Sequence, residues 1–373
     1  MSEILIIGAG IFGLDAAVAL SKSGNRVTIF EQNEDILSGT SGSSLLRIHS
    51  GLHYPRDITT AKQSKEGEFI FRERYSDCVN YGFKNYYAIA KISSRTTSEE
   101  YELFADNLSF PYRKCTDIFE FSDFVAMDKL SSVYEVNEGV VDVGSMREMF
   151  SNEIRKHGID IKNNHKVISV NKLNDHWEVS YEIQNKSEFS RHAQKYLQEF
   201  RYVIDATHMA NRKKFSDGIL KNQFEYQVTH MINIETKMPI FGLTVLDGNF
   251  ITVMPNGFNN SILIYGPKQS VLFRETGHQM KGDWANKEYL KSLVPIDAES
   301  KLLELFSEWF IGKLDIKVLS KVTGTRTIEA NVTQSDRRLS FVETLGDGLF
   351  SITSTKIDHS PAITAELCNR INS

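Results

Sequence analysis

The hydrophobic pattern of the first thirty residues predicts a strand, a helix and a second strand. Residues 4–7 are a continuous apolar run, as expected for a buried parallel strand. Apolar positions at helical spacing follow over 14–20, and Gly24 is expected to end that helix. The next apolar run, 26–30, stops at Glu31. This order predicts a parallel sheet of the Rossmann type.

The rest of the chain alternates between helical and strand patterns. Helices are predicted at 57–74, from Ser98, at 144–157 before Gly158, at 298–310, and from Ser360 with Pro361 as its first residue. Strands are predicted at 83–90, 159–161, 165–170, 177–181, 202–208 and 348–356, with an extended hairpin or insertion at 184–198. Alternation over 224–265, with turns at Asp247-Gly248 and Asn256-Gly257, predicts an antiparallel sheet.

Composition narrows the class of protein. The chain has 373 residues, 41% hydrophobic, which predicts two to three globular domains. Its 43 basic and 48 acidic residues give a net charge of −5, which argues against nucleic-acid binding. Three widely spaced cysteines, Cys78, Cys115 and Cys368, argue against a disulfide framework and against zinc. With neither a bilayer-length apolar run nor a signal peptide, we expect a cytoplasmic protein without an integral membrane segment.

Gly8, Gly10 and Gly13 have the G-x-G-x-x-G spacing, directly between the first strand and the first helix. Gly8 permits the tight turn, Gly10 lets a pyrophosphate approach the backbone, and Gly13 lets helix and strand pack closely. Glu31 stands at the distance where a carboxylate accepts ribose hydroxyls. The motif predicts a dinucleotide site for either NAD or FAD. The alternative is an ordinary βαβ unit with a glycine-rich turn.

Residues 4–31, followed by the Ser/Gly-rich loop 38–44, resemble the start of FAD-dependent oxidoreductases of the D-amino-acid-oxidase-like superfamily. That group includes glycine and sarcosine oxidases and the glycerol-3-phosphate and 2-hydroxyglutarate dehydrogenases. The resemblance implies FAD as cofactor. The residues it places at FAD are Gly8, Gly10, Ile11, Phe12, Gly13, Glu31, Gln32, Thr40, Ser41, Arg47, Val167, Ala206, Thr207, Gly324, Ser354, Thr355, Lys356 and Ile357.

A second loop, 44–55, resembles the I-H-x-G-x-x-Y segment of the two dehydrogenases. The resemblance implies that His49 lies near flavin and substrate, and His suits proton transfer because its pKa is near working pH. His53 stands where phosphate-oxidising relatives tend to carry Arg, which argues against a phosphorylated substrate. Arg47 is expected to neutralise the pyrophosphate or hold a substrate carboxylate. The alternatives are histidines that satisfy a local turn and a surface ion pair for Arg47.

The C-terminal part resembles the same superfamily at two places. Arg326, in a G-x-R segment, is implied to bind the anionic end of the substrate, with a salt bridge to Glu329 as the alternative. Lys356 is implied to lie at the ring edge or against a substrate oxygen, and the helix from Ser360 to point its N-terminus at the ring. We expect residues 336–338 to form a solvated turn. His230 is more simply a core or surface histidine than a site residue.

These observations predict an α/β protein, α+β overall, with a Rossmann-like FAD-binding domain and an inserted antiparallel β-sheet substrate domain. The FAD domain is assigned to 1–80, 140–215 and 320–373, and the substrate domain to 81–139 and 216–319. The expected activity is oxidation of a C–H bond next to an amine or hydroxyl of a small polar molecule, by hydride transfer to flavin N5. His49, His53, Arg326 and Lys356 are the candidate catalytic residues, and oxygen, a quinone or a protein is the electron acceptor.

Two other functions stay open on the sequence. One is a non-redox flavoenzyme similar to UDP-galactopyranose mutase, although no counterpart of its paired phosphate-binding arginines is evident. The other is a flavin-binding module without enzymatic activity.

Overall fold

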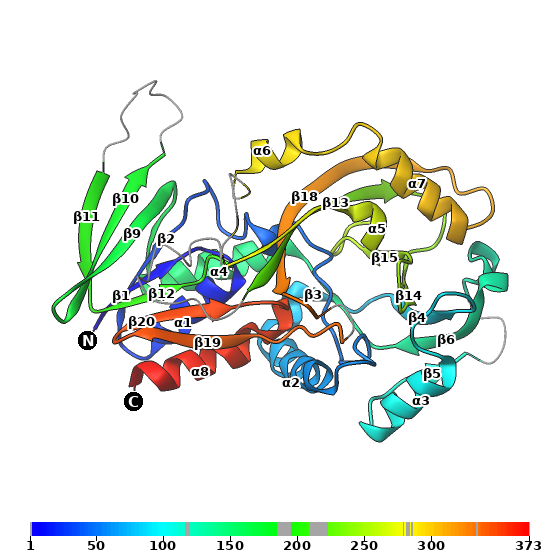
Figure 1. Cartoon of the computed structure of the whole chain (residues 1–373), viewed down its shortest axis with the longest axis horizontal. Coiled ribbons are helices and arrows are strands. Elements are labelled where there is room, and N and C mark those ends of the chain that lie inside the picture. Colours follow the sequence, from blue (N-terminus) through cyan, green and yellow to red (C-terminus); the bar gives the residue numbers. More distant parts are fainter. Residues whose placement is uncertain are drawn as a thin grey trace.

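The computed structural model describes residues 2–115, 120–184, 195–208, 223–278, 280, 284, 286–332 and 335–372. Two large sheets lie beside each other, and a three-stranded sheet stands at one end of the molecule (Figure 1). The architecture confirms the predicted α/β class with parallel and antiparallel sheets.

The first large sheet has six strands in the order β19-β20-β12-β1-β2-β8. Its strands are β1 (Glu3–Ile7), β2 (Arg26–Phe30), β8 (Asp160–Lys162), β12 (Tyr202–Asp205), β19 (Phe341–Gly346) and β20 (Leu349–Thr353). β20, β12, β1, β2 and β8 run parallel, and β19 is antiparallel at the edge. The predicted Rossmann-type start of the chain is therefore confirmed.

Both faces of this sheet are covered, which explains the unbroken apolar run of β1. Ile4 and Ile6 pack with helices in one buried cluster. These helices are α1 (Ile11–Lys22), α2 (Ile58–Tyr75), α4 (Val143–His157) and α8 (Ser360–Asn372). Leu5 and Ile7 face the other way and pack against the three-stranded sheet. A strand buried on both faces needs apolar residues at every position.

The three-stranded sheet consists of β9 (His165–Leu173), β10 (His176–Ile183) and β11 (Lys195–Phe200). β10 and β11 pair antiparallel, which confirms the predicted hairpin, although its tip at 185–194 lies outside the described residues.

The second large sheet has nine strands, in the order β17-β13-β16-β15-β14-β4-β6-β5, with β18 also paired to β13. They are β4 (Lys84–Ala90), β5 (Arg113–Lys114), β6 (Leu130–Val136), β13 (Phe224–Glu235), β14 (Phe241–Leu246), β15 (Thr252–Pro255), β16 (Ile262–Tyr265), β17 (Val271–Gly277) and β18 (Lys317–Glu329). Antiparallel pairs dominate, as predicted, but β14 pairs parallel with β4. The hairpin across Asp247-Gly248 is confirmed, because β14 and β15 pair antiparallel.

Shorter elements complete the fold. They are α3 (Ser98–Asn107), α5 (Pro267–Ser270), α6 (Lys287–Ser292), α7 (Ala298–Trp309), and a two-stranded sheet of β3 (Val79–Asn80) with β7 (Val140–Val141). The amphipathic helix α7 buries Leu302, Leu305 and Phe306 against the nine-stranded sheet.

The structure corrects two boundaries. The domain boundary predicted at 320 falls inside β18, which pairs with β13 from Lys317 to Glu329 and so belongs to the large antiparallel sheet. Ser360 is not an N-cap, because its backbone is already helical and a short 3₁₀ helix, η6 (Ile357–His359), precedes it. The extended residue before the helical segment is Lys356.

Within the described residues, every helix is too short or too polar to cross a membrane.

Candidate active site between the two large sheets

A cavity of about 1160 Å³ opens where the six-stranded and nine-stranded sheets meet. Its wall includes the start of α1, the end of β2, the loop 38–47, the inner faces of β13 and β18, and residues 354–357. All four candidate catalytic residues line it: His49, His53, Arg326 and Lys356. The predicted FAD contacts that line it are Gly8, Gly10, Ile11, Phe12, Glu31, Gln32, Thr40, Ser41, Arg47, Val167, Ala206, Thr207, Gly324, Ser354, Thr355, Lys356 and Ile357.

The remaining predicted contact, Gly13, lies behind the cavity wall and has a packing role. A Cβ atom on Gly13 would come 2.0 Å from the carbonyl oxygen of Gly8. Gly8 itself has φ of +101°, which an L side chain rarely adopts. The glycines thus bring the first turn of α1 against the end of β1.

The N-terminus of α1 is a backbone cradle open to the cavity. Gly10 is the N-cap and has no side chain to cover the first N–H groups. A Cβ atom there would lie 3.2 Å from the hydroxyl of Ser41, which accepts a hydrogen bond from Ile11 N at 3.1 Å. The remaining first-turn donors and the positive end of the helix suit a pyrophosphate.

Glu31 is fixed at the end of β2 by three hydrogen bonds. Its Oε2 accepts from Ala9 N at 2.7 Å, and its Oε1 accepts from the backbone and side-chain nitrogens of Asn33 at 2.8 and 2.6 Å. Each carboxylate oxygen has about two acceptor positions, so acceptor capacity is left for a ribose hydroxyl. A cavity-lining glycine cradle and a preoriented carboxylate fit the phosphate and adenosine parts of FAD.

Arg47 is buried at the cavity wall rather than exposed in a surface ion pair. Its Nε lies 3.3 Å from Glu138 Oε2, and the two side chains are 3% and 0% exposed. The guanidinium also donates to Thr244 and Tyr87 and lies 2.9 Å from His53 Nδ1. Contact of Arg47 with cofactor or substrate stays a prediction, since protein groups already surround most of the guanidinium.

Glu138 was missed by the sequence reasoning. Its Oε1 accepts from the backbone and hydroxyl of Ser50 at 2.8 Å each, and its Oε2 accepts from Tyr87 at 2.8 Å. The only available signal was an acid next to the apolar pair Val140 and Val141, which alone does not reveal burial.

His49 is held between two cations. Its Nε2 lies 3.2 Å from Lys356 Nζ, and its Nδ1 lies 3.4 Å from Arg47 Nε and 4.0 Å from Glu138 Oε2. Burial lowers the pKa of His49 well below its usual value, and the charges of Lys356 and Arg47 lower it further. The imidazole is therefore neutral, and because Nδ1 accepts from Arg47 Nε, the proton of the ring lies on Nε2, which faces Lys356 Nζ.

His53 shares this environment. Burial lowers its pKa well below the usual value, followed by the charges of Arg47 and Lys356. The rings of His49 and His53 lie 5.0 Å apart. Two neutral imidazoles thus line one wall of the cavity.

Lys356 is partly buried, three residues after the end of β20. Its Nζ lies 4.8 Å from the centre of the Tyr54 ring. Burial lowers the pKa of Lys356, and the charge of Arg338 acts in the same direction, whereas burial raises the pKa of Asp358. Asp358 accepts from His49 N at 3.3 Å and has a second oxygen without a partner among the described residues. A proton can therefore reside on either group near neutral pH.

Arg326 projects from β18 into the cavity and does not pair with Glu329. Its Nε and Nη2 donate to Gln227 Oε1 at 2.9 and 2.5 Å. The guanidinium lies 5.6 Å from the centre of the Tyr265 ring. Glu329 instead pairs with Arg337 at 3.4 Å.

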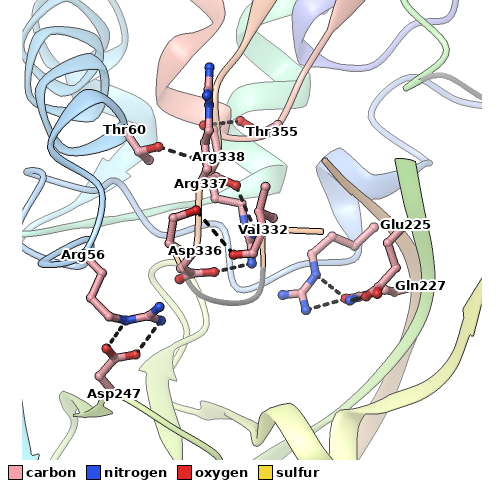
Figure 2. A network of polar contacts seen from close by, with 12 residues as sticks. Arg56, Thr60, Glu225, Gln227, Asp247, Val332, Asp336, Arg337, Arg338 and Thr355 are labelled. Carbon is pink, nitrogen blue, oxygen red and sulfur yellow. Dashed lines mark hydrogen bonds and ion pairs between the residues drawn. The ribbon is translucent and has the colours of Figure 1, made fainter. Parts of the chain in front are cut away.

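Two ion pairs at the cavity wall were not foreseen (Figure 2). Arg56 forms a two-pronged pair with Asp247. Arg338 pairs with Asp336 at 2.5 Å, with side chains 15% and 31% exposed, so the expected solvated turn is wrong for these two residues. Asp336 has φ of +57°, and this turn folds both side chains back toward the cavity.

Three further histidines line the cavity: His165, His208 and His230. His208, at φ of +55°, lies 3.0 Å from the Ser354 hydroxyl and accepts from Thr327 N at 2.9 Å. Burial lowers its pKa to about 4, so it ties β18 to the last strand as a neutral ring. His230 lies 2.9 Å from the Thr323 hydroxyl, and its Nε2 is unpartnered among the described residues.

Known proteins similar to this chain share its fold. Residues 3–356 match the family described as FAD dependent oxidoreductase. The solved glycine oxidase of Geobacillus kaustophilus is 12% identical with a TM-score of 0.70, over 100% of this chain and 95% of that one. The L-α-glycerophosphate oxidase of Mycoplasma pneumoniae, solved with FAD bound, is 15% identical with a TM-score of 0.71, over 100% of this chain and 95% of that one.

A curated relative is more similar in sequence over a shorter stretch. The FAD-dependent monooxygenase kojA of Aspergillus flavus is 31% identical over 157 residues, which cover 41% of this chain. The match spans 36% of the length of that relative. The family match extends over nearly the whole chain, so the chain belongs to the FAD-dependent oxidoreductase family, and FAD is its cofactor.

Proposed function

We propose that the chain oxidises a C–H bond next to an amine or hydroxyl group of a small, polar, anionic molecule. The observation that carries the proposal is the juxtaposition, in one cavity, of a partly buried Lys356–His49 pair and the cation Arg326. The names of the similar structures, an oxidase of glycine and an oxidase of glycerophosphate, support the same class of reaction.

The residues proposed to hold FAD are those of the glycine cradle, Glu31, the loop around Ser41, and the segment 354–357. Bound FAD supplies the two-electron oxidation, because its ring accepts a hydride from a C–H bond. The chain itself binds, orients and moves protons.

In this proposal, Arg326 binds the anionic end of the substrate and fixes which C–H bond faces the ring. Lys356 Nζ receives the proton that the substrate hydroxyl or amine releases, and His49, 3.2 Å away, orients the amine. Lys356 suits this role because burial lowers its pKa to about 7, which leaves a neutral amine near neutral pH. His53 completes the wall and restricts the space beside His49.

The proposal is tested by anaerobic mixing of the FAD-loaded protein with hydroxy acids, amino acids and sugars. Bleaching of the flavin spectrum by a hydroxy or amino acid supports it. Bound flavin that no such compound reduces, together with turnover of a sugar nucleotide, would favour the mutase-like alternative. Incorporation of an oxygen atom from O₂ into the product would favour the activity for which the Aspergillus relative is named.

A further inference from the structure

We propose that Gln227 sets the charge preference of the substrate site, because it orients Arg326 without neutralising it. The inference rests on the proposed function in placing the substrate at Arg326. It adds a specificity-determining residue and predicts how the substrate class would change with that residue.

The orientation of Gln227 is fixed from both sides. Its Oε1 accepts two hydrogen bonds from Arg326, and its Nε2 donates to Glu225 Oε1. Arg274 donates to the same Glu225 oxygen at 2.8 Å. Figure 2 shows Glu225 and Gln227 next to each other on β13. A flipped amide would place its NH₂ group against the two Arg326 donors and its oxygen against Glu225 Oε1, so only one orientation satisfies these contacts.

Gln227 is 1% exposed, and it lies between the buried Tyr226 and Val228 on β13. An uncharged buried amide needs partners on both ends, and here both partners are charged. The amide oxygen accepts from Arg326 and the amide nitrogen donates to Glu225, so the amide separates the two charged groups.

Among the described residues Arg326 has no acidic partner, unlike the cavity arginines Arg47, Arg56, Arg274 and Arg338. Each cavity acid among the described residues is already engaged, Asp247 by Arg56, Asp336 by Arg338, Glu329 by Arg337, Glu225 by Arg274, and Glu31 by backbone and amide donors. Within the described residues, the partners of Arg326 are the amide of Gln227 and the ring of Tyr265. Its charge is therefore available to a ligand.

Glutamate at position 227 would have nearly the same side-chain shape as glutamine but would place a negative charge beside Arg326. Its oxygen at the place of Gln227 Oε1 would accept both donors of Arg326 as a charge-assisted ion pair. Its other oxygen would face Glu225, whose charge Arg274 offsets. The cavity would then offer no unneutralised guanidinium at this place, and an anionic substrate would lose its main attraction.

The test compares Gln227→Glu and Gln227→Met with the wild-type protein, all FAD-loaded, by calorimetric titration. The probes are acetate, glycolate and inorganic phosphate, with acetamide and ethylene glycol as neutral counterparts. Gln198→Glu on β11 is the matched control, because it makes the same charge change in the remote three-stranded sheet. Gln227→Met keeps the charge of Arg326 but removes its acceptor.

We expect the wild-type protein and Gln198→Glu to prefer at least one anion by about tenfold or more, as a charge-assisted contact predicts. Gln227→Glu should lose this preference. Gln227→Met should bind anions more weakly but still prefer them, because Arg326 remains charged and is only less well oriented.

Retained preference in Gln227→Glu, equal loss of preference in both variants, or no preference in the wild-type protein would each overturn the inference. A purely structural role would affect both Gln227 variants alike. Flavin reduction separates this result from the proposed function. If the protein prefers anions but no compound reduces its flavin, the inference about Gln227 stands and the proposed function is wrong. If only neutral compounds reduce the flavin and no anion preference is found, the oxidation is supported and the inference about Gln227 is wrong.

Discussion

The buried carboxylate of Glu138 offers the sharpest test of how the site is supported. In Glu138→Gln the side chain keeps its shape but loses its charge. Every neighbour of the carboxylate within hydrogen-bond distance donates to it: Arg47, Tyr87, and the backbone and hydroxyl of Ser50. An amide has one acceptor and one donor end, so its NH₂ group would face either Ser50 N or the guanidinium. Neither can accept, and Arg47 would be left as an uncompensated buried charge.

Removal of one partner from a buried pair costs about 3–5 kcal/mol of stability. We therefore expect Glu138→Gln to lower the free energy of unfolding by about that amount, measured by urea denaturation of the FAD-loaded protein and followed by circular dichroism. The matched control is Glu135→Gln, three residues earlier on β6. Glu135 pairs with Lys84 and Arg113, whose side chains are 51% and 67% exposed, so its loss should cost less than about 1 kcal/mol.

A second comparison separates charge from shape. The double variant Arg47→Met with Glu138→Gln should recover part of the lost stability, because it removes the unpaired charge that the single variant creates. Equal small losses in Glu138→Gln and Glu135→Gln, or no recovery in the double variant, would refute the reasoning.

Three further predictions follow from single positions. Lys356→Met should lower the rate constant of flavin reduction about 10²- to 10⁴-fold with FAD content unchanged, measured by anaerobic stopped flow; an unaltered rate would contradict a proton-transfer role. Gly13→Ala should reduce the FAD retained on purification, because its Cβ would lie 2.0 Å from Gly8 O, and full retention would count against the cradle. Burial lowers the pKa of His359 to about 3, whereas the unfolded chain takes up a proton below about pH 6.5, so folding stability falls as the pH drops. His359→Asn should therefore lose about 1.4 kcal/mol less than the wild-type protein between pH 7.5 and 5.5, and parallel curves would be inconsistent with that pKa.

The elements near the N-terminus could be predicted because local chemistry determines them. The run 4–7, the glycine spacing and Glu31 each act within one βαβ unit, and the structure places the glycine cradle and Glu31 together at the cavity. Gly158, at φ of +61°, is another local feature, and it correctly predicted the end of α4. Such features need no knowledge of distant partners.

The features that could not be predicted depend on distant pairing. Val140 forms an isolated β-bridge with Arg47. This contact places Glu138 next to the loop that contains Arg47 and Ser50. The boundary within β18 depends on its register with β13, which is a tertiary property. Similarly, Arg338 lies at the cavity because Thr60 and Thr355 hold its backbone, at 2.9 and 2.7 Å. A polar residue in a buried strand, such as Gln227, can be recognised as a site residue only once the neighbouring strand and its side chains are known.

The most direct test of the account is a crystal structure of the FAD-loaded protein soaked with acetate. The account predicts the pyrophosphate at the N-terminus of α1, a ribose hydroxyl on Glu31, the ring beside Lys356, and the acetate on Arg326. A ring bound away from Lys356, or an anion that avoids Arg326 while Gln227 still holds it, would contradict the central claim that these elements form one oxidising site.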